Sequence, residues 1–98
     1  MIRNFASKTA EDIFNGENSK KARRVPVELH SKARRFLDQL NAAPSLEFMK
    51  IPPGNKFEPL QGDMKGLYSV RINDQWRVVF DWEENSPGEV DILDYHKG

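Results

Sequence analysis

Hydrophobic residues recur at helical spacing in the first half of the chain. They fall three or four positions apart on one stripe, which consists of Leu29, Ala33, Phe36, Leu37 and Leu40. Pro26 suits the first position of a helix, and Pro44 follows the last turn. The pattern therefore predicts an amphipathic helix from about Pro26 to about Ala43, with polar residues on its opposite face.

Shorter elements are expected before this helix. Ile2 to Phe5 is predicted to be a short opening strand. Ser7 is a good N-cap residue and Gly16 a good terminator, so a short helix is expected from Ser7 to Phe14. The polar stretch from Glu17 to Arg24 is interpreted as a connector.

The second half changes to strand-like alternation. Strands are predicted over 56–60, 67–72, 76–82 and 89–95, with turns over 62–66 and 73–75 and a loop over 83–88. One further helical turn is expected over 45–50. The order β-α-α-β-β-β-β predicts a single α+β domain over residues 1–98, with two helices packed on one face of a mostly antiparallel sheet.

The hairpin around Asn73 to Gln75 predicts a specific register. If those three residues form the loop, Val70 pairs with Val78 on the helix-covered face, and Arg71 lies opposite Arg77 on the other face. The same face receives Ser69 and Val79.

Two guanidinium groups directly across a strand pair repel each other. One interpretation is that an anion such as a phosphate lies between Arg71 and Arg77. The other is that each arginine pairs with a nearby carboxylate, for which the candidates are Asp74, Asp81 and Asp94. The geometry alone leaves both open.

Composition narrows the classes of protein. The chain has no cysteine and two histidines, which excludes disulfides and leaves few ligands for a transition metal. No cofactor or metal is indicated. No apolar run reaches the length of a membrane span, and the N-terminus lacks the stretch of a signal peptide, so a cytoplasmic protein is expected. His30 is expected on the surface.

Net charge is zero, but its distribution is uneven. Residues 1–50 carry ten basic and six acidic side chains, and residues 51–98 carry five and nine. The basic excess lies between Lys20 and Arg35, where Glu28 is the single acid. Such a block is compatible with RNA contact but is equally typical of a solvated helix face. The candidate RNA contacts are Arg34, Arg35, Lys56 and Lys65.

Three titratable side chains, Asp94, Tyr95 and His96, follow one another at the end of the last strand. Cleavage of RNA through its own 2′-hydroxyl needs a proton acceptor, a cation at the phosphate and a proton donor at the leaving oxygen. His96 suits either proton position, and Tyr95 could serve as the proton acceptor, as the donor or as a stacking partner for a base. The alternative is a solvated tail.

Residues 52–96 resemble the HigB group of the RelE superfamily of toxins, and the opening Met-Ile-Arg-x-Phe and the two predicted helices also fit that group, so the resemblance covers nearly the whole chain. The resemblance rests on a PPG turn, the L-x-G-D-x-K-G turn, the S-V-R-I-N-x-x-W-R-V-x-F hairpin and the terminal DYH. It implies a small α+β toxin that cleaves mRNA in the ribosomal A site without a metal. It also implies a HigA-like helix-turn-helix antitoxin, through which the pair binds operator DNA. Carried onto this sequence, Arg71 and Arg77 would hold the scissile phosphate, and Asp94, Tyr95 and His96 would complete the site.

Two departures from that group stand out. Where its members often read HPLKG, this chain has Glu58 and Gln61 in place of the histidine and the lysine. A carboxylate at position 58 could act as the general base, whereas Gln61 carries no charge. The zero net charge is the second departure, since phosphate contacts dominate such binding. These features favour an alternative interpretation, a non-catalytic module that binds ribosome or antitoxin with the same fold. A nuclease acting on free RNA is a third.

Overall fold

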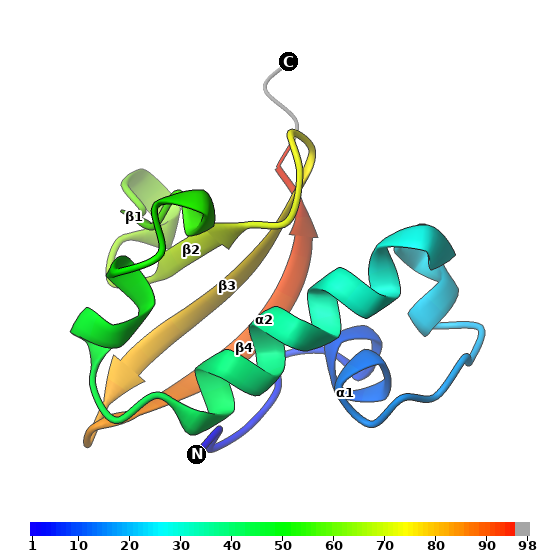
Figure 1. Cartoon of the computed structure of the whole chain (residues 1–98), viewed down its shortest axis with the longest axis horizontal. Helices are drawn as coiled ribbons and strands as arrows, with labels where there is room; N and C mark the ends of the chain where they lie inside the picture. The colour runs from blue at the N-terminus through cyan, green and yellow to red at the C-terminus, as the bar shows by residue number, and fades with distance from the viewer. Residues whose placement is uncertain (96–98) are drawn as a thin grey trace.

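Two α-helices pack on one face of a four-stranded antiparallel sheet in the computed structural model, which describes residues 1–95 (Figure 1). The helices are α1 (Lys8–Phe14) and α2 (His30–Ala42). The strands lie in the order β1 (Glu58–Pro59), β2 (Tyr68–Arg71), β3 (Trp76–Glu83) and β4 (Ser86–Asp94). The α+β class and the meander of antiparallel strands are confirmed.

Short 3-10 turns fill the connections. They are η1 (Ala22–Arg24), η2 (Val27–Leu29), η3 (Leu46–Lys50), η4 (Pro53–Asn55) and η5 (Gly62–Met64). The segment η2 runs directly into α2, so the predicted long helix starts with a tighter turn. Within residues 1–95 no helix is long and apolar enough to cross a membrane.

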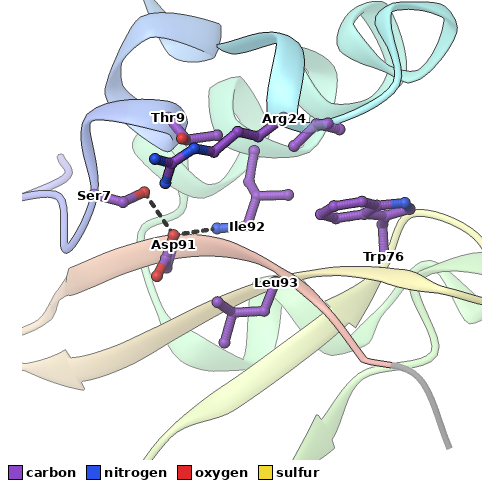
Figure 2. A pocket seen from close by; sticks show the side chains of 8 residues that line it. Ser7, Thr9, Arg24, Trp76, Asp91, Ile92 and Leu93 are labelled. Atoms are coloured by element: carbon purple, nitrogen blue, oxygen red, sulfur yellow. Dashed lines mark hydrogen bonds between the residues drawn. The ribbon is translucent and has the colours of Figure 1, made fainter. Parts of the chain in front are cut away.

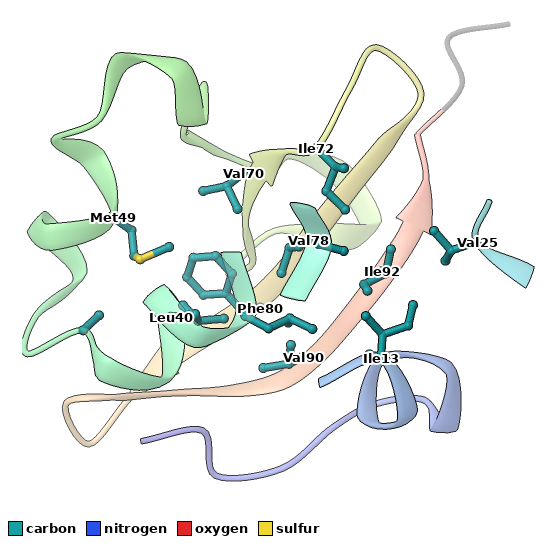
Figure 3. Packing of buried hydrophobic residues seen from close by; sticks show 14 of the residues in the cluster. Ile13, Val25, Leu40, Met49, Val70, Ile72, Val78, Phe80, Val90 and Ile92 are labelled. Carbon is teal, nitrogen blue, oxygen red and sulfur yellow. The ribbon is translucent and has the colours of Figure 1, made fainter. Parts of the chain in front are cut away.

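The core lies between α2 and the sheet. Ala33, Leu37 and Leu40 of the predicted stripe are completely buried. They meet the inward side chains of the strands, and Phe80 is the largest of the side chains that are fully buried (Figure 3). Alternation along the strands sends every second residue to this core, and that fixes which side chains reach the opposite face of the sheet.

The short helix α1 begins and ends as its sequence predicts. The Ser7 hydroxyl accepts a hydrogen bond from the Ala10 amide at 3.1 Å, and Gly16 adopts a left-handed φ of 77° just beyond the helix. His30, in contrast, was expected on the surface, and this is wrong. Its ring is buried, with Nε2 2.9 Å from the carbonyl oxygen of Val25, the residue that follows η1, because the chain folds back before α2.

The opening segment is not a full strand, contrary to expectation. Phe5 makes one isolated parallel bridge with Val90, flanked by a hydrogen bond from the Arg3 amide to the Pro87 carbonyl at 2.8 Å. The Arg3 guanidinium also binds Asp81. Residues 1–6, here called the N-terminal arm, therefore lie along β4 as a short parallel addition and then leave it at Ser7 to enter α1.

Two strand boundaries also differ from the prediction. The loop expected over 83–88 is a two-residue turn at Glu84 and Asn85, whose φ values are 53° and 60°, so β4 begins at Ser86. The strand expected over 56–60 is reduced to Glu58–Pro59, because Lys56 adopts a left-handed φ of 49° before it and the η5 turn begins at Gly62 soon after it.

Candidate functional site

Arg71 and Arg77 lie directly opposite each other on β2 and β3, as the hairpin predicts. Val70 faces Val78 in the adjacent position, and both valines are fully buried in the core. The two arginine side chains therefore project from the face of the sheet that the helices do not cover. Two positive charges of this kind need anions or polar partners near them.

The Arg77 side chain contacts three other residues. Its Nη1 atom lies 2.5 Å from a carboxylate oxygen of Glu58 and 2.9 Å from the hydroxyl oxygen of Ser69. Its guanidinium carbon lies 4.4 Å from the centre of the Tyr95 ring. The arginine side chain is 6% exposed, whereas that of Glu58 is 48% exposed. Arg77 is therefore a fixed cation whose carboxylate partner is open to solvent.

The carboxylate interpretation of the arginine pair is confirmed for Arg77, but with a different acid from those expected. Glu58 reaches it because β1 pairs with β2, with Glu58 opposite Ser69. Of the three candidate acids, Asp81 binds Arg3 instead, and Asp94 accepts a hydrogen bond from the Gln75 side chain at 3.0 Å.

Arg71 is more loosely paired. Its Nη1 atom is 3.9 Å from Asp74, whose side chain is fully exposed, so this contact is a weak surface ion pair. Its Nε atom is buried and has no hydrogen-bond partner among residues 1–95. A buried donor of this kind is costly unless an acceptor reaches it. The Arg71 side chain therefore offers a free N–H beside the fixed cation.

The register of β4 separates the predicted C-terminal residues. Leu93 faces Arg77 and Asp94 faces Trp76, so Tyr95 lies on the same face as Arg77 while Asp94 projects from the other. Asp94 binds the hairpin turn through Gln75 and does not join the arginines. His96 was predicted to belong to this site, and it lies outside the described residues.

Ser69 is the site residue that sequence reasoning did not assign. The hairpin register already placed it beside the two arginines, and its hydroxyl is completely buried against Arg77. The sequence did contain a signal for this assignment: Ser69 is a small polar residue on the same face of the hairpin as the two arginines. The described cluster is thus Glu58, Ser69, Arg71, Arg77 and Tyr95, here called the arginine cluster.

The four predicted RNA contacts divide into two groups. Lys56 and Lys65 are exposed in the segments that lead into β1 and β2. Arg34 and Arg35 lie on α2, across the sheet from the arginine cluster. The Arg34 Nε atom donates to the Ile13 carbonyl at 3.0 Å and so caps the end of α1, while Arg35 lines a shallow hollow with Lys32, Phe36 and Gln39.

A separate cleft opens at the outer edge of β4 (Figure 2). Its lining includes Arg24 and Val25 from the segment around η1 and Trp76, Ile92 and Leu93 from the sheet. No residue of the arginine cluster lines it. The Asp91 carboxylate accepts hydrogen bonds from the Ser7 hydroxyl at 2.6 Å and from the Ile92 amide at 2.8 Å, so it closes the strand edge where the N-terminal arm departs.

No group of three or more histidine, cysteine or acidic side chains within residues 1–95 is arranged to hold a metal ion. The positive charge of the arginine cluster comes from guanidinium groups. Combined with a carboxylate, a hydroxyl and a phenol, these guanidiniums form a set that can bind an anionic ester and exchange protons with it.

Two helices on a four-stranded antiparallel sheet with this connectivity form the fold of RelE-type toxins. The structure resembles the YoeB–YefM complex from Staphylococcus aureus, with a TM-score of 0.60 and 22% identity over 99% of this chain and 97% of that one. It also resembles a mutant of YafQ from E. coli, with a TM-score of 0.62 and 17% identity over 96% of this chain and 91% of that one.

Sequence similarity identifies the family. Residues 3–96 match the family described as the RelE-like toxin of type II toxin-antitoxin system HigB. Toxin HigB-1 of Vibrio cholerae serotype O1 is 38% identical over 97 residues, which cover 99% of both chains. An uncharacterized protein of Haemophilus influenzae is 30% identical over 74% of this chain and 71% of its own. The chain belongs to the HigB-like family of type II toxins.

Proposed function

We propose that this toxin is an endoribonuclease that cleaves mRNA in the ribosomal A site and so inhibits translation. The observation that carries the proposal is Arg77, a cation fixed by Ser69 and Tyr95 beside a solvent-open carboxylate and opposite a second arginine. A preorganised cation of this kind stabilises the charge that develops on a phosphate during transesterification.

The proposed reaction uses the ribose of the substrate as the nucleophile. The Glu58 carboxylate takes the proton of the 2′-hydroxyl, and the 2′-oxygen attacks the phosphorus. The bond from phosphorus to the 5′-oxygen breaks, leaving a 2′,3′-cyclic phosphate. The departing oxygen takes a proton from Tyr95 or His96. Arg71 and Arg77 neutralise the non-bridging oxygens, so we propose that no metal is needed.

Two predicted roles differ in their structural support. Tyr95 stacks on Arg77, which supports a place in the reaction. Asp94 faces away from the cluster and holds the hairpin turn, so we propose that it acts by positioning the end of β4 and makes no direct contact with RNA.

Ribosome dependence is proposed from the distribution of charge. Lys56 and Lys65 are exposed near the entrance of β1 and β2, where they would contact the mRNA backbone. Lys32 and Arg35 lie across the sheet, where they would contact ribosomal RNA. The acidic second half of the chain gives no general attraction to free RNA, so we expect the ribosome to supply most of the affinity.

The proposed protein partner is a HigA-like helix-turn-helix antitoxin. Membership in a type II toxin-antitoxin family supports it, as does the likeness of the fold to a YoeB–YefM complex. Operator DNA would be bound only through that antitoxin. We propose that the toxin acts in the cytoplasm, where translating ribosomes are found.

A second candidate function is a weakly active or non-catalytic module that binds ribosome or antitoxin. The contact between Glu58 and Arg77 favours it, because the proposed phosphate-binding arginine is already occupied by a carboxylate. Gln61 also lacks the charge of the lysine that often occupies this position in the HigB group.

The deciding experiment is cleavage of mRNA on programmed ribosomes, with naked mRNA alongside. Wild type is compared with Arg77→Lys and Arg77→Ala, and circular dichroism and antitoxin binding show that each variant is folded. We expect wild type to cut the mRNA at A-site codons. Arg77→Lys should cut it much more slowly, and Arg77→Ala should not cut it at all. A folded wild type that binds antitoxin and ribosome without cutting would establish the second function.

A further inference from the structure

The side chain of Glu58 is bound to the same atom of Arg77 to which a phosphate would have to bind. Its carboxylate oxygen is 2.5 Å from Nη1 of Arg77, and the same nitrogen donates to Ser69. In this state the Arg77 guanidinium is already paired with the Glu58 carboxylate. A carboxylate bound in this way is also engaged by the guanidinium, so it is not free to accept a proton from a ribose.

The two partners of this ion pair differ in freedom. Arg77 is 6% exposed and packs against the Tyr95 ring, so it stays in place. The side chain of Glu58 is 48% exposed and comes from β1, a strand of two residues at the sheet edge. An incoming anion therefore displaces Glu58 into solvent and leaves the guanidinium where it is.

Arg71 supplies the preference for a phosphate over the carboxylate. Its Nε–H is buried without a partner in the described part of the chain, directly across the strand pair from Arg77. A phosphodiester has two non-bridging oxygens and can bind both arginines, whereas the observed carboxylate contacts Arg77 alone. A phosphate that bridges the two arginines would accept a hydrogen bond from Arg71 Nε, and this bond would offset the loss of the contact between Glu58 and Arg77.

We propose that Glu58 is an internal competitor of the substrate phosphate, and that phosphate binding to Arg71 and Arg77 releases Glu58 to act as the base. This rests on the proposed function and adds a coupling to it, because the same exchange that seats the scissile phosphate frees the proton acceptor. In the absence of RNA the cluster is self-occupied, and the toxin holds other anions weakly.

Glu58→Gln separates the two roles. The amide keeps the size of the side chain but loses the charge and the basicity. We expect the variant to bind a trinucleotide RNA with 2′-O-methyl riboses at least about fivefold more tightly than wild type, since the competing occupant is weakened. On programmed ribosomes it should cleave about 100-fold more slowly, since the base is gone. A residue with only a structural role would weaken both.

The matched control is Glu83→Gln, which removes the same charge from an exposed position at the end of β3. Its affinity and cleavage should equal those of wild type. Arg77→Ala should abolish the gain in affinity when it is combined with Glu58→Gln. Glu58→His, which offers a neutral proton acceptor without a negative charge, should bind the trinucleotide tightly and recover part of the cleavage.

Binding and cleavage report separately on this inference and on the proposed function. If wild type cleaves mRNA but Glu58→Gln binds the trinucleotide no more tightly, the competitor role is wrong and the nuclease stands. If Glu58→Gln binds more tightly but no protein cleaves, the exchange is real and the nuclease function is wrong. If Glu83→Gln also bound the trinucleotide more tightly, the gain in affinity would come from the overall loss of negative charge and not from the site, and the proposal would be overturned.

Discussion

The ring of Tyr95 lies against the guanidinium of Arg77, 4.4 Å from its central carbon. This contact joins the residue that follows β4 to the start of β3, and it adds to the contacts that Glu58 and Ser69 make with the arginine. It also brings a phenolic hydroxyl to the cluster. The observed stacking and the proposed proton transfer would be separable roles of one side chain, and substitutions distinguish them.

Tyr95→Phe keeps the ring and removes the hydroxyl. We expect unchanged binding of 2′-O-methyl RNA and cleavage slowed by about 100-fold if the phenol is the proton donor. Tyr95→Leu removes both, so binding should also weaken by about two- to fivefold. Affinity is measured by titration and cleavage on programmed ribosomes. Wild-type cleavage by Tyr95→Phe would assign the proton to another group.

Gly88→Ala tests the contacts that hold the N-terminal arm against β4. An added methyl group would lie 2.8 Å from the Asn4 side-chain oxygen and would also clash with the Arg3 guanidinium. The hydrogen bond from the Glu89 amide to Asn4 and the contact of Arg3 with Asp81 would be lost. We expect a destabilisation of about 1–2 kcal/mol.

The melting temperature measures this effect, and amide exchange at Val90 shows whether the arm has detached. Gly54→Ala is the control, because no atom of the described residues, other than those of position 54 and its two chain neighbours, lies within 4 Å of the added methyl group there. Equal melting temperatures for Gly88→Ala and wild type would mean that the arm contributes nothing to stability.

Asp12 predicts a specific pH dependence of stability. The Ser19 hydroxyl donates to it at 2.5 Å and the Lys8 ammonium lies 3.0 Å away, and both lower the pKa of this buried carboxyl below its ordinary value. Its contribution is therefore complete above the ordinary pKa of about 4 and is lost as the pH falls through the lower value in the folded protein.

Asp12→Asn should accordingly melt below wild type at pH 7, and the gap should narrow at pH 3. Glu11→Gln removes a charge from the same helix at a half-exposed position whose contact with Lys8 is 3.6 Å, and it should change the melting temperature little. A gap between wild type and Asp12→Asn that stays constant from pH 7 to pH 3 would contradict the assignment.

His30→Ala should destabilise the fold without touching the arginine cluster. The substitution leaves the Val25 carbonyl oxygen without its 2.9 Å partner and leaves a space where the buried ring was. We expect a loss of about 1–3 kcal/mol in urea denaturation. His30→Gln, whose amide can donate to the same oxygen, should recover part of it. Loss of RNA affinity in a folded His30→Ala protein would contradict the separation of the two regions.

The hairpin between β2 and β3 was predictable to the residue because two local signals agree. Alternation on both strands requires one register, and Asn73 closes the turn by accepting hydrogen bonds from the amides of Gln75 at 2.9 Å and Trp76 at 2.7 Å. The opposition of Arg71 and Arg77 follows from that register alone. No long-range contact was needed to find it.

The turn between β3 and β4 could not be identified in the same way. Both of its central residues, Glu84 and Asn85, adopt positive φ, yet neither is glycine. Pro87 and Gly88 follow them and suggest a loop, although both are buried within β4. Pro87 is tolerated there because β4 is an edge strand, and its carbonyl binds the amide of Arg3.

The arginine cluster depended on contacts that sequence patterns do not encode. Glu58 reaches Arg77 only because a two-residue strand pairs with β2 in one particular register. The side to which Asp94 points is set by its pairing with Trp76, across a sheet whose β3–β4 register shifts between Val79 and Asp81. A single-residue shift moves a side chain to the opposite face.

The arrangement of the cluster has a consequence for how the toxin is made. Synthesis proceeds from the N-terminus, yet the N-terminal arm pairs with Val90, and the last described residue, Tyr95, completes the arginine cluster. A nascent chain therefore carries no assembled arginine cluster while its early helices emerge. The cluster can assemble only once nearly all of the described chain has been synthesised.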